Sequence, residues 1–361
     1  MLHYFKVSIP LIQEFKTSFG VQYQREAVIL RYYDGEIEAF GEMVSDEYPG
    51  YSYEFNDAEI IVIKKYLAPI LKKTQDPEEF SKLTEHIKGH NMAKAALEMM
   101  LYDYISKKEE KPLYKFIGRT KGYADVGISI GISSIDATIS TVEKAVNRGY
   151  KRIKVKIQKG HDIELLKSLR GKFPNIPLSV DANQDYTLKD LETLKKLDDF
   201  NLEYIEQPLG KDDFIGYTKL KKEIQTKICL DESIESPASA IMYIEAGIAD
   251  IINLKPGRMG GIGNTLKVID IAKKNSVGLW VGGMLETGIG RSFNISIASL
   301  EDVKLPGDTS PNDKYFWKDI TMEVFTMENG RIYPFNNPGI GVTIDYPNFI
   351  QVMKDGEKII D

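Results

Sequence analysis

The chain has 361 residues, of which 28% are charged, and a formal net charge of −6 at pH 7. Charges of both signs are interspersed and no basic block stands out, so we expect neither a nucleic-acid nor a membrane partner. A single cysteine, Cys229, excludes an internal disulfide, and no run approaches the ~18 apolar residues of a membrane-spanning helix. With no leader-like start, this indicates a cytoplasmic protein.

Residues 1–122 predict an α+β domain. Alternating apolar residues over 27–42 predict strands, and Asp34-Gly35 supplies a hairpin turn between them. Helical periodicity follows over residues 57–73, 76–88 and 91–107. Strands followed by helices are typical of an α+β arrangement.

Residues 123–312 instead follow a repeated step. Five ionisable residues each end a short apolar run, with separations of 25, 25, 25 and 24 residues: Lys156, Asp181, Glu206, Asp231 and Lys255. Such a step suits one strand, one helix and two short loops, and therefore predicts successive βα units of a parallel barrel. The carboxyl ends of barrel strands form one rim, so these five side chains should converge on one active site.

Other elements complete this picture. The first barrel strand should contain Ser129, a helix should span residues 136–148, and a seventh strand should lie within 278–284, followed by a helix from about Gly290. Residues 313–361 return to strand-like, turn-rich sequence with Asn329-Gly330 as a second hairpin turn. We expect this tail to pack on the first domain. The glycine-rich segment 257–263 could be a phosphate cradle, but it lacks the required spacing, which favours a tight loop.

The strand RIKVKI (152–157) predicts two inward-facing lysines. Side chains alternate across a strand, so Lys154 and Lys156 share one face and the apolar residues share the other. Buried ammonium groups need a partner or a lowered pKa, and three nearby carboxylates can supply the partner.

Those carboxylates in turn predict a divalent metal. Asp181, Glu206 and Asp231 would repel one another without a cation, and an all-oxygen ligand set favours Mg²⁺ or Mn²⁺ over zinc. A single such residue is most often a solvated charge or an ion-pair partner; the shared register of all five favours a functional site.

Two lysines on strands four units apart would flank a metal-bound carboxylate substrate. One amine could remove the α-proton, while the metal holds the resulting enediolate. A lysine acts as a base only if its pKa falls toward neutrality, and the ammonium of Lys154 beside Lys156, together with the metal, would lower it.

With these residues the chain resembles the enolase superfamily, for which a Lys or His base with Mg²⁺ is a known arrangement. The lysine pair and the opposed lysine resemble the muconate-lactonising-enzyme subgroup. Segments along nearly the whole chain are similar to the o-succinylbenzoate synthase and N-acylamino acid racemase family: FKTSFG (15–20), GHNMAKAALE (89–98), SIGI (129–132), RIKVKI, DANQDY (181–186), EQPL (206–209), LDES (230–233), NLKPGRMGG (253–261), GGMLETGIGR (282–291) and LPGDTS (305–310).

The resemblance implies a modified (β/α)7β TIM barrel with an α+β capping domain, divided into residues 1–122, 123–312 and 313–361. It implies Lys156 and Lys255 as the opposed acid and base, Lys154 as an assisting group, and Mg²⁺ on Asp181, Glu206 and Asp231. We further expect a small-molecule carboxylate substrate and a homo-oligomer. The residues expected at or behind the substrate are Ser129, Asn183, Gly283, Met284, Leu285, Phe19, Tyr23, Tyr51, Glu232 and Glu286.

Several functions share these residues. The leading hypothesis is dehydration to o-succinylbenzoate in menaquinone synthesis, racemisation of an N-succinylamino acid, or both. A dipeptide epimerase or cycloisomerase is an alternative that GGMLETGIGR disfavours. A non-catalytic barrel that binds a metal or a carboxylate would need neither Lys156 nor Lys255.

Overall fold

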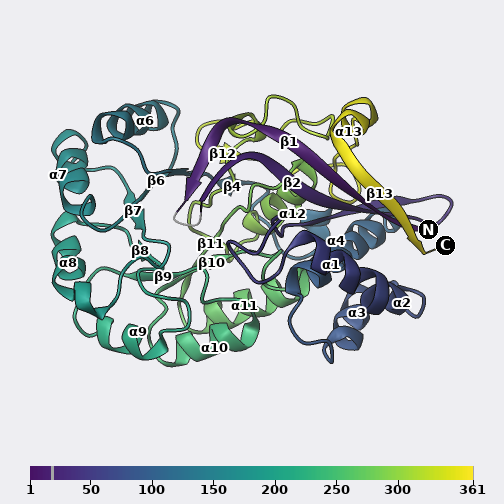
Figure 1. The fold of residues 1–361 in the computed structure, drawn as a ribbon, viewed down its shortest axis with the longest axis horizontal. Helices are drawn as coiled ribbons and strands as arrows, with labels where there is room; N and C mark the ends of the chain where they lie inside the picture. The colour runs from purple at the N-terminus through teal and green to yellow at the C-terminus, as the bar shows by residue number, and fades with distance from the viewer. Residues whose placement is uncertain (18–19, 361) are drawn as a thin grey trace.

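The computed structural model describes the chain except for residues 18, 19 and 361 and the side chains of residues 15–17. Its first part contains a four-stranded antiparallel sheet with the strand order β13-β1-β2-β3. The strands are β1 (Leu2–Thr17), β2 (Gly20–Tyr33), β3 (Glu38–Met43) and β13 (Met353–Ile360). Leu2 pairs with Ile360, so the tail of the chain returns to the first sheet and both termini lie at the same end of the molecule (Figure 1).

Helices cover one face of this sheet. They are α1 (Asn56–Val62), the π-helical turn η1 (Ile63–Leu67), α2 (Ala68–Leu71), α3 (Pro77–Thr84), α4 (Asn91–Lys108) and α5 (Leu113–Phe116). Helix α4 packs directly on β3. This close approach requires a glycine at position 41, since a Cβ there would lie only 2.0 Å from the carbonyl oxygen of Ala96. Leu97 of α4, Leu30 of β2 and Met43 of β3 share one core, whereas Ile29 of β2 and Phe40 of β3 belong to the larger core that extends into the parallel sheet.

The second part is a curled parallel sheet of seven strands in sequential order, from β5 to β11. The strands are β5 (Gly127–Ile130), β6 (Arg152–Lys156), β7 (Leu178–Asp181), β8 (Ile205–Glu206), β9 (Ile228–Leu230), β10 (Ile251–Leu254) and β11 (Gly278–Val281). Lys156 pairs with Asp181, and Asp181 pairs with Glu206. The 25-residue step therefore does bring these strand ends into register.

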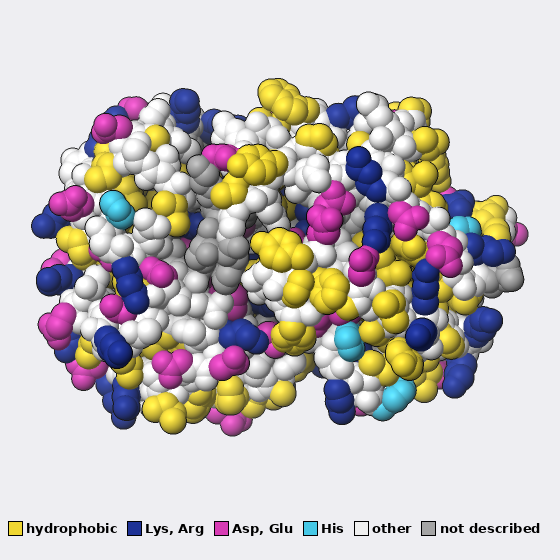
Figure 2. All heavy atoms as spheres, in the orientation of Figure 1, with side chains coloured by type: hydrophobic (Ala, Val, Ile, Leu, Met, Phe, Trp, Pro, Cys, Tyr) yellow, Lys and Arg dark blue, Asp and Glu magenta, His cyan; other side chains and the backbone are white. Residues whose placement is uncertain are grey.

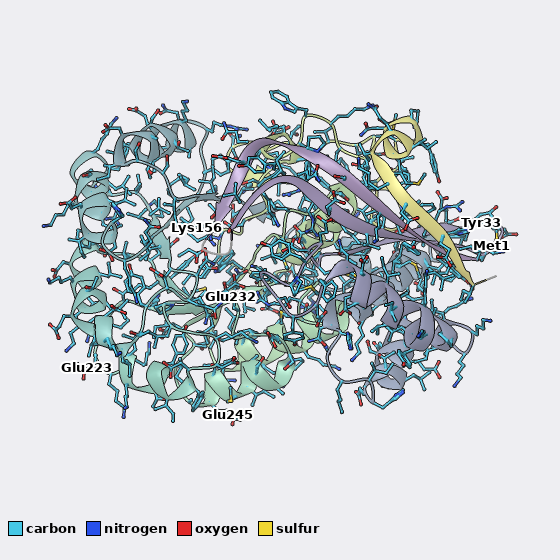
Figure 3. All side chains as sticks on the ribbon, in the orientation of Figure 1. Met1, Tyr33, Lys156, Glu223, Glu232 and Glu245 are labelled. Carbon is cyan, nitrogen blue, oxygen red and sulfur yellow. The ribbon has the colours of Figure 1, made fainter. Side chains whose placement is uncertain are left out.

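Helices follow the strands and lie outside the sheet (Figure 1). They are α6 (Ile135–Asn147), α7 (Asp162–Lys172), α8 (Leu191–Lys196) between the 3-10 turns η2 (Leu188–Asp190) and η3 (Leu197–Phe200), α9 (Phe214–Leu220), α10 (Pro237–Glu245), α11 (Ile262–Lys274) and α12 (Gly288–Ala298). Ile153, Val155 and Ile157 point into the core between the sheet and these helices. Lys156 and Glu232 lie inside the sheet, whereas Glu223 and Glu245 lie at the outer edge (Figure 3).

An extended segment at 305–308 bonds to both edge strands of the parallel sheet. The Leu305 and Asp308 amides donate to the carbonyl oxygens of Leu279 and Val281 on the β11 side, at 3.1 and 2.9 Å. On the other side, the Gly127 amide donates to Gly307 at 2.7 Å. The rest of the chain forms the short sheet of β4 (Ala124–Asp125) and β12 (Arg331–Ile332), the turn η4 (Asn312–Lys314) and α13 (Tyr346–Val352).

The glycine-rich segment 257–263 is a tight loop that leads into α11. Glu98 of α4 accepts hydrogen bonds from the Ile262 and Gly263 amides at 2.6 and 3.0 Å. A Cβ at Gly261 would lie 1.9 Å from the Glu98 carboxylate, which explains the glycine there. The amides that a phosphate would need are thus already taken by a side chain of the first part.

Lys and Arg side chains mix with Asp and Glu side chains on the face that Figure 2 shows. Among the described residues, no helix combines the length and apolar composition that crossing a bilayer requires.

Candidate active site

A cavity of about 150 Å³ opens at the carboxyl ends of the parallel strands. Its walls come from both parts of the chain. Residues 20–22 at the start of β2 and residues 44–51 after β3 face the strand ends of the parallel sheet. Ligand sites are common at this end of parallel βα sheets.

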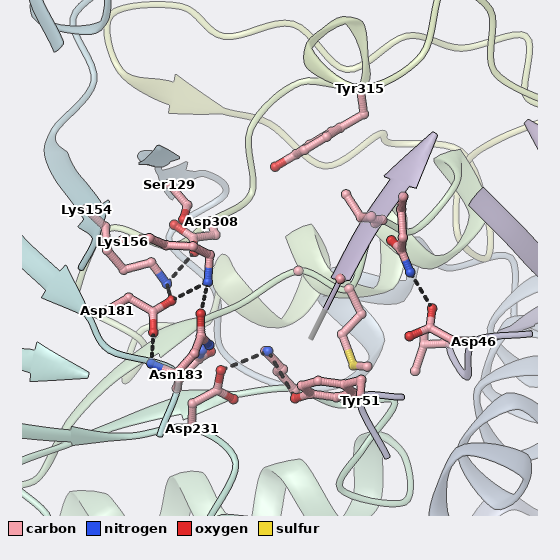
Figure 4. A pocket seen from close by; sticks show the side chains of 18 of the residues that line it. Asp46, Tyr51, Ser129, Lys154, Lys156, Asp181, Asn183, Asp231, Asp308 and Tyr315 are labelled. Atoms are coloured by element: carbon pink, nitrogen blue, oxygen red, sulfur yellow. Dashed lines mark hydrogen bonds and ion pairs between the residues drawn. The ribbon is translucent and has the colours of Figure 1, made fainter. Parts of the chain in front are cut away.

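Strand β6 places two buried lysines at the cavity (Figure 4). The Lys154 Nζ lies 2.7 Å from Glu206, 2.9 Å from Asp308 and 3.5 Å from Asp181. The Lys156 Nζ lies 3.0 Å from Asp181 and also donates to the Asn183 side chain. Alternation along β6 therefore turns both ammonium groups toward the carboxylates, as the sequence predicts.

Lys255, directly after β10, reaches the same cavity from the other end of the carboxylate row. Its Nζ lies 2.8 Å from Asp231, whose other oxygen accepts from Arg258 Nη1 at 2.6 Å. Tyr51, from the first part of the chain, accepts from Arg258 at 2.7 Å. Strands β6 and β10 are four apart in the sheet, with β7, β8 and β9 between them.

Charge and burial compete in this cluster. Burial would lower the pKa of Lys154, but the charges of Asp308, Glu206 and Asp181 raise it well above its usual value. Burial likewise opposes the charge of Lys255, while Asp231 raises the lysine pKa. Each of these two ammonium groups lies against a carboxylate, which stabilises its charged form.

The carboxylates respond differently. Burial would raise the pKa of Asp231, but Lys255 and Arg258 hold it well below its usual value. For Glu206, burial and the charges of Asp181 and Asp231 outweigh the effect of Lys154 and raise the pKa to about 8. At Glu206, burial and the neighbouring carboxylates therefore favour the protonated form more strongly than Lys154 favours the charged form.

The backbone is strained beside the cavity. Asn183, Gln207 and Leu285 have positive φ angles of 41°, 38° and 57°. Asparagine tolerates this conformation, whereas leucine adopts it at a cost of order 1–3 kcal/mol. Such strain is typical of functional sites, and here it lies at three loops that follow parallel strands.

Only some of the other predicted residues line the cavity. Those that line the cavity are Ser129, Asn183, Gly283, Met284, Leu285 and Tyr51. Glu232 is buried and accepts from Asn183 at 3.1 Å, and Glu286 accepts from the Met284 amide at 2.8 Å. Tyr23 is 68% exposed and is not among the cavity-lining residues. Phe19 lies outside the described residues.

The structure adds residues that the sequence reasoning passed over: Asp308, Arg258, Arg152, Arg291 and Tyr315. Asp308 lies 2.9 Å from Lys154 and 2.8 Å from Arg152. Its segment, LPGDTS, is part of the family resemblance. Asp308 does not, however, stand at the end of an apolar run in the 25-residue repeat, so the spacing did not single it out. Arg258 lies only three residues after Lys255, so its position in the sequence could have predicted that it lies at the site.

The donor set fits a hard divalent cation. Asp181, Glu206 and Asp231 are buried oxygen donors on or beside adjacent strands, and Lys154 now bridges the first two. Among the described residues, no three Asp, Glu, His or Cys side chains lie close enough together to hold a metal ion in this arrangement. The chemistry of the donors still matches the preference of Mg²⁺ or Mn²⁺ for carboxylate oxygens.

Comparison with known proteins agrees with this architecture. The family model described as "Enolase C-terminal domain-like" matches residues 137–348, and that of the mandelate racemase and muconate lactonizing enzyme N-terminal domain matches residues 3–118. The chain therefore belongs to the enolase superfamily. It shares TM-score 0.95 and 36% identity with a solved superfamily member from Listeria innocua, over 99% of this chain and 97% of that one.

Two curated relatives are more specific. The chain is 39% identical to the o-succinylbenzoate synthase of Enterococcus faecalis over 351 residues, which cover 96% of each protein. It is 40% identical to the N-succinylamino acid racemase of an Amycolatopsis species over 341 residues, which cover 93% of this chain and 92% of the relative. Relatives of both kinds are enzymes.

Proposed function

We propose that this protein removes the proton α to a carboxylate of a small molecule, as an o-succinylbenzoate synthase, an N-succinylamino acid racemase, or both. One observation carries the proposal. Lys156 and Lys255 reach one cavity from strands four apart, and the three carboxylates lie on or directly after the strands between them. A substrate carboxylate placed at that row would have its α-carbon between the two amines.

In racemisation, the neutral amine of one lysine takes the α-proton, and the C–H electron pair moves into the carboxylate to form an enediolate. The ammonium group of the opposite lysine then returns a proton to the other face. In dehydration, one lysine takes the α-proton, and the enediolate expels the β-hydroxyl, which leaves as water after that same lysine, now an ammonium group, passes the proton to it. The lysine that is not the base stabilises the enediolate by its charge.

Other residues of the chain position these two lysines. Asn183 orients Lys156, and Tyr51 with Arg258 fixes the position of Asp231 beside Lys255. Tyr51 comes from the first part of the chain, which covers the cavity and limits the access of water. We include in the proposal that residues 1–122 and 313–361 form one capping unit, and that the segment 305–308 closes the parallel sheet into a (β/α)7β barrel.

Mg²⁺ is the metal that we propose for Asp181, Glu206 and Asp231. When bound, it would supply positive charge for the developing enediolate and would offset the charges of the carboxylates that raise the pKa of Lys154 and Lys255.

The test removes and restores the metal. We expect exhaustive chelation to abolish both racemisation of N-succinylphenylalanine and formation of o-succinylbenzoate from its hydroxylated precursor, and added Mg²⁺ to restore activity. Asp181→Asn, Glu206→Gln and Asp231→Asn should each weaken metal binding, measured by calorimetry, while the far-UV circular dichroism is kept. Full turnover after chelation would overturn the metal assignment. Activity on an Ala-Glu dipeptide alone would favour the epimerase alternative.

A further inference from the structure

Glu42 of β3 is a buried carboxylate that reaches from the first part of the chain into the second. Gly41 faces α4, so alternation along the strand turns Glu42 to the opposite side. Glu42 is 1% exposed, and its Oε1 accepts a hydrogen bond from the Thr287 amide at 3.0 Å. Its Oε2 accepts from the Thr287 hydroxyl at 2.6 Å and from the Gly290 amide at 2.9 Å. Both oxygens are therefore bound to the start of α12.

The start of α12 is shaped for this approach. The first amides of a helix have no partner within the helix, and its N-terminus favours negative charge. A Cβ at residue 290 would lie 2.8 Å from the Glu42 carboxylate, which explains the glycine there. A second carboxylate, Asp319 of the tail, accepts from the Gly288 amide at 3.0 Å. Side chains from outside the parallel sheet thus hold this helix at its first turn.

The residues held in this way adjoin the cavity. Leu285 lines the cavity and has a φ angle of 57°, a conformation that costs leucine free energy and persists only where its surroundings fix it. On its N-terminal side, the Met284 amide donates to Glu286 at 2.8 Å. On its C-terminal side, Thr287 is bonded to Glu42. Glu42 therefore supplies one of the two anchors between which this strained residue lies.

Burying Glu42 costs stability. Burial raises the pKa of its carboxyl to about 7, although the hydrogen bond from the Thr287 hydroxyl and the charge of Arg25 oppose the shift. Arg25 does not form an ion pair with Glu42 but pairs with Asp46, at 2.8 Å. An apolar side chain at this place would avoid the cost of burial. What the carboxylate adds is a fixed position for the start of α12 and for the loop before it.

We propose that Glu42 is a positioning residue, which fixes the cavity wall at residues 283–285 through Thr287 and Gly290 and so keeps the cavity in the shape that binds the substrate. This inference rests on the proposed function. Glu42 is not among the residues that line the cavity, so it acts without touching the substrate. The carboxylates proposed to bind the metal lie on or after β7, β8 and β9, whereas this wall follows β11. Substrate binding and metal binding should therefore respond differently to a change at Glu42.

The test compares Glu42→Ala with Glu42→Gln in the racemisation of N-succinylphenylalanine. Glu42→Ala removes every hydrogen bond to α12, so we expect KM to rise at least tenfold and more than kcat falls, while the Mg²⁺ affinity, measured by calorimetry, stays within twofold of wild type. Glutamine keeps one acceptor but turns an NH2 group toward a donor of α12, so Glu42→Gln should raise KM by a smaller factor, about threefold. Glu98→Ala is the matched control, because Glu98 is also buried and bonds to the start of α11, but no residue from 256 to 282 is among those that line the cavity.

In a purely structural role, the rise in KM would follow the loss of stability in urea, and Glu98→Ala would share it. A KM within twofold of wild type in Glu42→Ala, or an equal rise in Glu98→Ala, would therefore overturn the positioning role and leave the proposed reaction standing. If Glu42→Ala does not fold, Glu42→Gln decides, and a KM equal to that of the wild type overturns the proposal. If the wild-type protein binds N-succinylphenylalanine without racemising it, the proposed reaction fails, and a tenfold loss of calorimetric affinity for this ligand in Glu42→Ala would still support the positioning role.

Discussion

Asp308 offers a direct check on the charge balance of the site. Its carboxylate bridges two buried cations, Lys154 at 2.9 Å and Arg152 at 2.8 Å, and is itself only 12% exposed. In an Asp308→Asn variant, Lys154 keeps Glu206, but Arg152 keeps only the Pro306 carbonyl oxygen and the face of Trp280. The variant thus leaves one buried positive charge without its partner.

Removing one partner of a buried ion pair costs about 3–5 kcal/mol. The asparagine can still accept a hydrogen bond, so we expect a loss near the lower end, about 3 kcal/mol in the free energy of unfolding. The free energy of unfolding of a globular protein is about 5–15 kcal/mol in total, so the variant should still fold but should be clearly less stable than the wild type. We also expect at least a tenfold fall in kcat, which corresponds to about 1.4 kcal/mol in the activation free energy, because Lys154 loses one of the two acids nearest to it.

The assay is urea denaturation of the wild-type protein and the variant, followed by circular dichroism. Asp302→Asn is the matched control, since Asp302 pairs with Lys273 at the surface, where the two side chains are 31% and 61% exposed. Such surface pairs contribute about 0–1 kcal/mol. If Asp308→Asn lowers the free energy of unfolding no more than Asp302→Asn does, and keeps full kcat, our account of this charge cluster is wrong.

Two further predictions concern the contact between the two parts of the chain. Burial raises the pKa of Glu98 from 4.5 to about 7, although the amides of Gly263 and Ile262 and the Ser81 hydroxyl oppose the shift. Because the folded protein holds this proton more tightly than the unfolded chain, the free energy of unfolding of the wild type falls as the pH rises from about 4.5 to 7. Glutamine does not titrate, so between pH 5 and pH 8 the free energy of unfolding of Glu98→Gln should rise by up to about 3 kcal/mol relative to that of the wild type. Parallel stability curves for the two proteins would contradict this, and exposed Glu78→Gln is the control. A fragment of residues 123–312 should be insoluble or inactive, because Tyr51 and residues 20–22 line the cavity from outside that range; wild-type turnover by this fragment would refute the two-part organisation.

The sequence predicts most of the fold because its regular elements are strongly patterned. The expected helix over 91–107 is α4, and the expected helix over 136–148 is α6. The 25-residue step locates the strand ends that carry Lys156, Asp181 and Glu206, since a βα repeat sets both the chain spacing and the register. The tail is less regular than expected: the strand-like stretch 321–335 forms only β12 and isolated bridges.

The site is predicted less completely, for a physical reason. Residues on repeated strand ends share a register that the sequence displays, whereas Asp308, Tyr315 and Tyr51 reach the cavity from segments outside that step. Their convergence depends on tertiary packing. Tyr23 illustrates the limit: it lies two residues from cavity-lining Val21, yet it is 68% exposed. The protonation of the lysines also depends on ion pairs that only the structure places.

The central claim is that Lys156 and Lys255 act on opposite faces of one bound carboxylate. It is tested most directly by exchange of the α-proton in D₂O, followed by NMR on each enantiomer of N-succinylphenylalanine. Lys156→Ala and Lys255→Ala should both abolish racemisation, because one amine must take the proton and the other must return one. Each variant should keep slow exchange only of the enantiomer whose α-proton faces its remaining lysine, and the two variants should therefore show opposite preferences. Racemisation at the wild-type rate by either variant, or the same enantiomer preference in both, would contradict the opposed-lysine mechanism.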